Sequence, residues 1–456
     1  MYELDVNEEN IKKTIATDVL GRNGSIFNFL KLIYSINTKS TISIDGNWGT
    51  GKTFFVKQTE LIMNLLNNPK GNETEPEIQS VKDKIKNKLN ELEINTYGNT
   101  RAIYYNACEY DYFCEPILTI IADIIKNNSN IEITNPNVKE SIGEKLDKFA
   151  SSFKFGVTFQ NKDGNAVGFE VQKERGEHKN SLIEKIILDK QLEDNFKSLL
   201  EELLVEKSNR LVIFVDELDR CNPIFAVKLL ERIKNFFNDE RFIFVFSINL
   251  EQLQHTIKKY YGESFDGAYY LQKFFDYQLE LPAIKIEDYI RYQIDYFDID
   301  IGNYFEESIK SVIYYLGFNL RDCNKYFQAL KLKYRQIKSN QSTRTSNVLF
   351  LHILFPLLLG MKIKRPDEYL KVKNGKGKSN FYNLLNSCES IKDYMGRYIG
   401  KDELSNLEKY INQLYEFIYI NKNEYDLIIH SSLSITRNSC DVLDGFLSCL
   451  GEKVQL

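Results

Sequence analysis

The sequence predicts an α/β fold, in which a parallel β-sheet carries helices on its faces and a helical lid and lobe follow. Short, continuous apolar runs are typical of buried parallel strands, and several of them end in a polar residue. A glycine-rich turn at residues 42–53 joins one such strand to a helix. Beyond about residue 284 the apolar residues recur at helical spacing, and 8 prolines in 456 residues leave room for long helices.

The glycine-rich turn carries the first chemical signal. Residues 42–53 read I-S-I-D-G-N-W-G-T-G-K-T and match the template G-x-x-x-x-G-K-[ST]. Glycines let backbone N–H groups surround a phosphate, and the positive end of the following helix favours the same anion. We expect Lys52 to reach the β- and γ-phosphates of a nucleotide and the Thr53 hydroxyl to bind Mg²⁺. The predicted nucleotide-binding residues are Gly46, Asn47, Trp48, Gly49, Thr50, Gly51, Lys52, Thr53 and Phe54.

Paired carboxylates carry the second signal. The apolar run at residues 211–215 ends in Asp216 and Glu217. A magnesium–nucleotide site needs carboxylates at the tip of a buried strand facing the phosphate loop (residues 46–53). We expect Asp216 to hold Mg²⁺ through a water molecule and Glu217 to polarise the attacking water. Asn222 and Pro223 then predict the N-cap and first turn of a helix.

A third buried strand at residues 242–247 leads to Asn249. Its side chain is a candidate to sense the γ-phosphate or to orient water. Capping of the next helix is an equally good interpretation, and both roles are compatible.

Two further strands are predicted at residues 101–107 and 275–282. The first delivers Glu109 and Asp111 to the edge where open α/β sheets bind ligands. These two acids lie either near the phosphates or in a solvated loop.

Changes in composition divide the chain into segments. Ser25 is the expected N-cap of the helix that precedes the phosphate-loop strand. The predicted parts are a helical lead-in (1–40), a core (41–283) with polar insertions near 67–100 and 135–200 and a β-hairpin near 153–172, a helical lid (284–345), and a helical C-terminal lobe (346–456) with a mobile connection at 373–380.

Composition restricts the function classes. The seven cysteines form no C-x-x-C pair and the four histidines are widely spaced, which argues against a disulfide framework or a structural metal. The acidic N-terminus without an apolar segment predicts a cytoplasmic protein. A net charge of −5 gives nucleic-acid binding little support. The apolar run at residues 348–363 is too short to span a bilayer and predicts a buried helix.

Several of these stretches together resemble the KAP family of P-loop NTPases. They are G-N-W-G-T-G-K-T at 46–53, V-I-F-V-D-E-L-D-R-C-N-P at 212–223, Y-L-Q-K-F-F-D at 270–276, N-L-R-D at 319–322 and D-V-L-G-R at 18–22. The resemblance implies ATP as the nucleotide, an ASCE-type core with one strand between the phosphate-loop strand and the acidic strand, and a helical lid. Family members are often bacterial, and some take part in phage exclusion. Many carry transmembrane helices between the two motifs, whereas residues 67–200 here are polar.

The leading functional hypothesis is an ATPase that drives oligomer assembly or a conformational switch in a defence complex, as a homo-oligomer with a partner effector protein. The alternative is a nucleotide-gated scaffold with negligible turnover. Arg321, in the segment resembling the family's lid, is a candidate to read the γ-phosphate from within the subunit, and Arg220 is a candidate arginine finger for a neighbour. The competing interpretation pairs these arginines with Asp322 and Asp219 in surface salt bridges.

Overall fold

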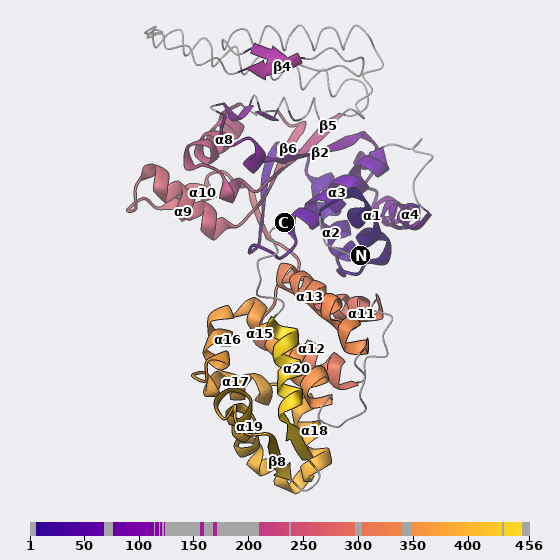
Figure 1. Ribbon diagram of the computed structural model, residues 1–456. Coiled ribbons are helices and arrows are strands. Elements are labelled where there is room, and N and C mark those ends of the chain that lie inside the picture. The colour runs from indigo at the N-terminus through magenta and orange to yellow at the C-terminus, as the bar shows by residue number, and fades with distance from the viewer. Residues whose placement is uncertain are drawn as a thin grey trace.

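The computed structural model arranges the chain as a sheet-containing core above a helical lobe (Figure 1). Two short strands, β3 (Gly156–Thr158) and β4 (Val167–Glu170), pair antiparallel in the segment where a hairpin is expected. The rest of the predicted insertion at 135–200 lies outside the described residues. The structure describes residues 6–67, 76–113, 115–117, 119–120, 123, 156–158, 167–170, 209–236, 239–296, 303–339, 348–430 and 433–448.

A five-stranded, all-parallel sheet forms the centre of the core, in the order β2-β5-β6-β1-β7. This arrangement confirms the predicted fold class. Strand β6 separates the phosphate-loop strand β1 from the acidic strand β5, as the family resemblance implies. The strands are β1 (Ser40–Asp45), β2 (Thr100–Asn106), β5 (Arg210–Asp216), β6 (Phe242–Ile248) and β7 (Tyr277–Glu280).

Both faces of the sheet are buried at the three strands β2, β5 and β6, because alternate side chains of each of these strands enter two different cores. In β5, Val212 and Phe214 join the core formed with the N-terminal helices, whereas Ile213 and Val215 join the core under α8 and α9. Continuous apolar strands are the expected result of burial on both sides. Figure 1 shows the two layers. They comprise α1 (Glu8–Thr17), α2 (Asn23–Ser35), α3 (Lys52–Asn67) and α4 (Pro76–Glu91) on one side, and α8 (Pro223–Phe236), α9 (Leu250–Tyr261) and α10 (Gly267–Gln272) on the other.

Helix boundaries test two of the predicted caps. Asn222 caps α8 as predicted, since its side-chain oxygen accepts a hydrogen bond from the Ile224 N–H at 3.0 Å. The prediction for Ser25 was wrong. Helix α2 begins at Asn23 with Arg22 at the N-cap position, and the Ile26 N–H already bonds to the Arg22 carbonyl at 2.8 Å. Asp18, rather than Ser25, supplies the local bond at this helix start, because its carboxylate accepts from the Asn23 N–H at 3.0 Å, and the buried Arg22 side chain anchors it further.

The polar segment after α3 contributes a packed helix to the core. Helix α4 is charged on its outer face, but it buries Ile78, Ile85 and Leu89. It packs against α1 and α3. The predicted polar insertion near 67–100 therefore includes a helix that packs over the N-terminal helices.

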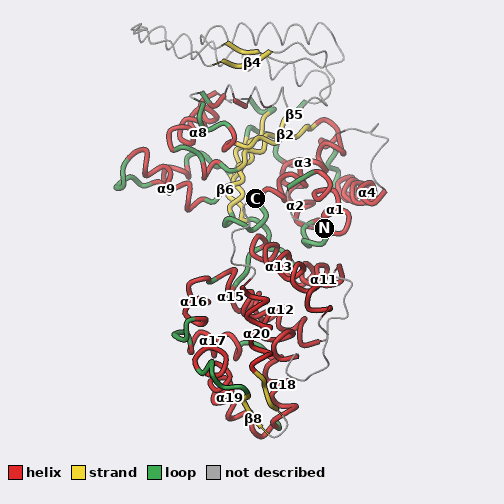
Figure 2. The backbone as a smooth tube through the Cα atoms, in the orientation of Figure 1, coloured by secondary structure: helices red, strands yellow, loops and turns green. Residues whose placement is uncertain are grey.

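From residue 286 onward the described residues are mainly helical, and they include one short β-ribbon (Figure 2). Only helices were expected beyond residue 345, and this was wrong at β8 (Asp426–His430) and β9 (Leu433–Thr436). Leu433 and Ile435 alternate into the core, a period-2 pattern too short to stand out from its helical neighbours. The helices are α11 (Ile286–Tyr296), α12 (Asn303–Leu316), α13 (Leu320–Ser339), α15 (Phe355–Lys364), α16 (Pro366–Lys373), α17 (Lys378–Asn386), α18 (Glu389–Ile399), α19 (Leu407–Tyr415) and α20 (Arg437–Ser448).

The long apolar run is buried, as predicted. It forms a π-helical turn (Val348–Leu354) that continues into α15, whose residues 355–361 are all buried. Gly360 allows this helix to pack closely on α12, because a Cβ there would overlap the Val312 side chain. Within the described ranges, no helix has the length and apolar character needed to cross a membrane.

Candidate nucleotide site

The predicted site residues meet at the carboxyl-terminal edge of the sheet. In the parallel register, Asp216 of β5 lies beside Ser247 of β6, and Asp45 of β1 lies beside Ile248. The turns that leave these three strands therefore share one edge, which is where open α/β sheets bind ligands.

The phosphate loop adopts a conformation that needs its glycines. Gly49 and Gly51 have φ of 82° and 86°, in the left-handed region. A Cβ on Gly49 would lie 2.9 Å from the side-chain oxygen of Asn319, and one on Gly51 would lie 2.9 Å from Leu320. The loop is thus both left-handed and covered closely by the chain that begins α13.

Each backbone carbonyl from residue 46 to residue 51 accepts a hydrogen bond from a protein donor. Because these oxygens are already bonded to protein, the loop can present N–H groups to an anion without exposing competing acceptors. The donors include the N-cap residue of α2, the first residue of α3 and residues at the start of α13. Lys52 Nζ bonds to Gly46 O and Asn47 O, Asn319 Nδ2 to Trp48 O (3.3 Å), Arg321 N to Gly49 O (3.1 Å), and Arg22 to Thr50 O (3.0 Å) and Gly51 O (2.9 Å).

Lys52 is a buried cation surrounded by carboxylates. Its side chain folds back onto the Gly46 carbonyl at the start of the loop. Burial lowers the pKa of Lys52, while the negative charges of Asp219 and Asp216 raise it. The ammonium therefore stands between the loop and the acidic strand, where a phosphate would replace a carbonyl as its partner.

The two predicted magnesium ligands are in contact. Thr53 Oγ1 donates to Asp216 Oδ2 at 2.7 Å, and the Asp216 side chain is almost wholly buried. The Glu217 N–H bonds to the other carboxylate oxygen at 3.0 Å. A hydroxyl and a carboxylate are hard oxygen ligands, which fit a Mg²⁺ ion that takes its remaining ligands from phosphate and water.

Glu217 follows the acidic strand in a strained backbone conformation. Its φ of 60° and ψ of 21° are left-handed, which costs a non-glycine residue about 1–2 kcal/mol. Its carboxylate pairs with Arg220 at 2.6 Å. Burial raises the pKa of Glu217, and the Arg220 charge partly offsets that rise. The expected alternative partner of Arg220 was Asp219, and the structure places the ion pair on Glu217 instead.

Comparison with known proteins agrees with this geometry. Residues 22–314, more than half of the chain, match the KAP family P-loop domain. The chain belongs to the KAP family of P-loop NTPases. No curated protein matched the sequence.

The start of α13, just beyond the matched KAP domain, is docked on the phosphate loop. Asn319 and Asp322 cap α13 reciprocally, since Asn319 Oδ1 accepts from Asp322 N (2.9 Å) and Asp322 Oδ2 accepts from Asn319 N (3.1 Å). Asp322 forms its ion pair with Lys364 of α15, so the expected pair of Asp322 with Arg321 is not the one observed. Arg321 is exposed, and its charge lowers the pKa of Glu217.

Trp48 joins the loop to the acidic turn. Its indole N–H donates to Asp219 Oδ2 at 2.6 Å, and the Arg220 guanidinium lies 5.8 Å from the centre of the ring. The buried Asp219 thus holds the loop tryptophan, while Glu217 holds the arginine. Trp48 therefore connects the phosphate loop to the turn that carries Glu217 and Arg220, two of the candidate catalytic residues.

Asn249 caps the next helix, which confirms one of its two predicted roles, while the role in sensing the γ-phosphate or orienting water stays a prediction. Its side-chain oxygen caps α9 by accepting from Gln252 N at 3.1 Å, and its amide nitrogen lies 3.4 Å from Asn47 Oδ1 in the loop. Phe54, by contrast, is buried, and its side chain belongs to the hydrophobic core.

The two acids after β2 bond to neighbouring turns. Asp111 accepts from the Asn222 N–H at 2.8 Å, next to the acidic strand's own turn. Glu109 accepts from the side chain of Asn106 at 2.9 Å.

Two residues at the site were missed by the sequence analysis. Arg22, 2% exposed, bonds through Nη1 and Nη2 to the loop and through Nε and Nη2 to Pro282 O at 3.1 and 2.7 Å. Tyr104 donates its hydroxyl to Asp216 Oδ2 at 3.0 Å. For Arg22 the only signal was the D-V-L-G-R stretch, which was noted without a role. The alternation of β2 predicts which face Tyr104 occupies, but it does not predict its partner.

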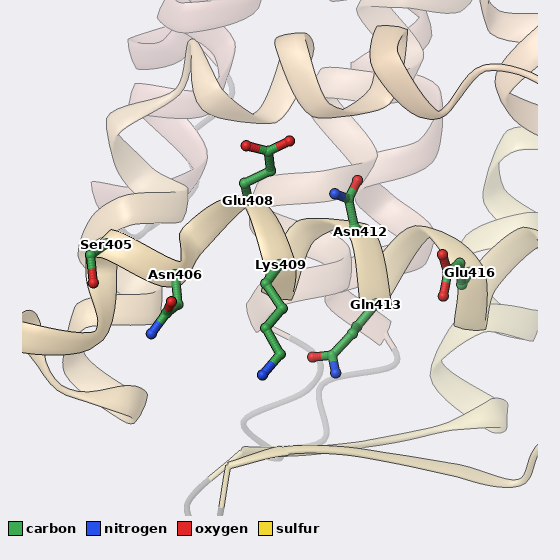
Figure 3. Close-up of a pocket in the computed structure, with 7 residues that line it drawn as sticks. All are labelled: Ser405, Asn406, Glu408, Lys409, Asn412, Gln413 and Glu416. Carbon is green, nitrogen blue, oxygen red and sulfur yellow. The ribbon is translucent and has the colours of Figure 1, made fainter.

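A separate hollow of about 540 Å³ lies along α19 in the C-terminal lobe. Figure 3 shows Glu408 and Asn412 on one side of the helix and Lys409 and Gln413 on the other. These side chains do not converge on one point, so the hollow offers no arrangement for catalysis.

Proposed function

We propose that this KAP domain binds ATP with Mg²⁺ and hydrolyses it to drive assembly or a conformational switch. The observation that carries the proposal is the meeting of Lys52, the Thr53–Asp216 pair and Glu217 at one edge of the sheet. A cation, a pair of hard oxygen ligands and a carboxylate are the groups that phosphoryl transfer to water needs.

Each residue has a specific task in this proposal. Lys52 exchanges its bond to the Gly46 carbonyl for the β- and γ-phosphates. Thr53 and Asp216 hold Mg²⁺, which neutralises charge on the phosphate oxygens when bound. Glu217 orients the attacking water and accepts its proton, which requires the carboxylate to be freed from Arg220.

The structure also supports a second candidate, a nucleotide-gated scaffold with negligible turnover. The Glu217–Arg220 ion pair, at 2.6 Å, neutralises the group expected to act as the base. If ATP binding does not separate this pair, the nucleotide serves to fix the lid and recruit a partner rather than to be consumed.

The cellular setting that we propose is an anti-phage defence complex, built from a homo-oligomer and a partner effector protein. Its support is the family resemblance, since some members take part in phage exclusion. The test compares phage plating on cells that express the wild type or the Lys52→Ala variant. Equal protection by both would contradict a nucleotide-driven defence role.

Mass photometry with and without ATP, beside a phosphate-release assay, separates the two candidates. The ATPase proposal predicts a change in oligomer mass together with steady phosphate release. A mass change with no release supports the scaffold. The Lys52→Ala variant is the matched control. If the wild type, like this control, shows neither a mass change nor phosphate release, both candidate functions are contradicted.

A further inference from the structure

Tyr104 contacts the proposed magnesium site from an element outside both nucleotide motifs. It lies on β2, the edge strand beside β5, and donates its hydroxyl to Asp216 Oδ2 at 3.0 Å. The Thr53 hydroxyl donates to the same oxygen at 2.7 Å. One carboxylate oxygen therefore accepts from two hydroxyl groups that come from different elements.

The position of Tyr104 is set by helix α3, which also carries Thr53. One helical turn after Thr53, the Lys57 ammonium lies 4.3 Å from the centre of the Tyr104 ring. Farther along the same helix, the Asn64 side chain bonds to both the N–H and the carbonyl of Ala102, each at 3.0 Å. Helix α3 thus binds the open edge of β2 and fixes Tyr104 relative to Thr53.

These contacts determine the orientation of the Asp216 carboxylate. Oδ2 has two hydroxyl donors and Oδ1 accepts from the Glu217 N–H at 3.0 Å, so rotation about the carboxylate bond is blocked from both sides.

We propose that Tyr104 is a positioning residue for magnesium: its hydroxyl holds the Asp216 carboxylate in the orientation that binds the metal together with Thr53. This inference rests on the proposed function, because it assumes that nucleotide binds with Mg²⁺. Side chains that hydrogen-bond to a metal-binding carboxylate and so orient it typically contribute 10–100-fold to metal affinity.

The test compares Tyr104→Phe with a matched control, Tyr105→Phe. Both variants lose one hydroxyl from β2, but Tyr105 faces the opposite core, where its hydroxyl pairs with Thr119 at 2.7 Å. Binding of Mn²⁺ to the full chain with saturating ADP is measured by electron paramagnetic resonance. ADP affinity in EDTA and the thermal unfolding midpoint are measured in parallel.

We expect Tyr104→Phe to weaken Mn²⁺ binding by about 10–100-fold while ADP affinity in EDTA stays unchanged. Tyr105→Phe should bind Mn²⁺ like the wild type. Wild-type Mn²⁺ affinity in Tyr104→Phe would overturn the inference and leave the proposed function intact. An equal loss in both variants would also overturn it, because that pattern indicates a general effect on β2. A wild type that binds ADP without Mn²⁺ would refute the proposed function itself.

Discussion

Replacement of Arg22 by methionine tests whether the phosphate loop depends on a residue outside its own motif. The Arg22 guanidinium bonds to the carbonyls of Thr50, Gly51 and Pro282. Burial lowers its pKa from 12.5 to about 10, so the charge persists at neutral pH. One pKa step corresponds to about 1.4 kcal/mol, so holding this charge inside the protein costs about 3 kcal/mol.

The Met variant removes that cost but also leaves carbonyls without their donor. Gly51 O keeps its bond from Phe55 N at 3.2 Å, whereas Thr50 O and Pro282 O lose their bonds to Arg22. An unsatisfied buried acceptor costs about 1–3 kcal/mol, so two of them cost about 2–6 kcal/mol. The two effects oppose each other, and we expect the free energy of unfolding to change by no more than about 3 kcal/mol.

Nucleotide affinity should change more clearly than stability. A hydrogen bond from a charged donor contributes about 1.5–3 kcal/mol. If the phosphate loop loses that contribution, the nucleotide affinity of Arg22→Met should be about 10–100-fold weaker than that of the wild type. The Arg22→Lys variant keeps the charge, but its side chain cannot reach all three carbonyls. Its nucleotide affinity should therefore lie between that of the wild type and that of Arg22→Met. The assay is titration with a fluorescent ATP analogue beside urea unfolding. A folded Arg22→Met variant with wild-type affinity would refute the reasoning.

Two further predictions concern the site arginines. Arg220→Ala should move the acid limb of the pH–rate profile to higher pH, because the guanidinium lowers the burial-raised pKa of Glu217 and its loss lets that pKa rise. An acid limb that stays in place, measured by phosphate release at subsaturating ATP so that the profile reports the free enzyme, would contradict this coupling. If Arg321 acts within its own subunit, Arg321→Ala should stay defective when mixed with Lys52→Ala protein, whereas a finger acting between subunits should regain activity. Recovery in the Arg321→Ala mixture, or wild-type hydrolysis by Arg321→Ala alone, would contradict the role within the subunit.

The sequence was sufficient for the sheet and for the nucleotide motifs, because both follow from local patterns. The apolar run before Asp216 predicts a strand buried on two faces, and the glycine spacing before Lys52 predicts a phosphate loop. Parallel strands share their carboxyl-terminal edge, so these motifs were expected to meet. The structure has this sheet, and it brings Thr53 and Asp216 into contact at 2.7 Å.

Local sequence patterns could not predict the contacts between residues that are distant in the chain. Arg22 reaches Pro282, and Trp48 reaches Asp219, through side chains whose direction depends on packing rather than on periodicity. The choice of Glu217 over Asp219 as the partner of Arg220 likewise depends on the left-handed backbone at Glu217, for which no glycine or asparagine gave a signal.

A single-turnover experiment tests the central claim most directly, by measuring bound ATP and released phosphate for each variant of the full chain with Mg²⁺. The wild type should bind and hydrolyse ATP. Glu217→Gln should bind ATP but release phosphate about 10²–10⁴-fold more slowly, because an amide cannot accept the proton from water. Lys52→Ala should do neither, since it lacks the cation that faces the phosphates. Wild-type binding by Lys52→Ala, or normal turnover by Glu217→Gln with the loss appearing in Asp219→Asn instead, would contradict the assignment of this site.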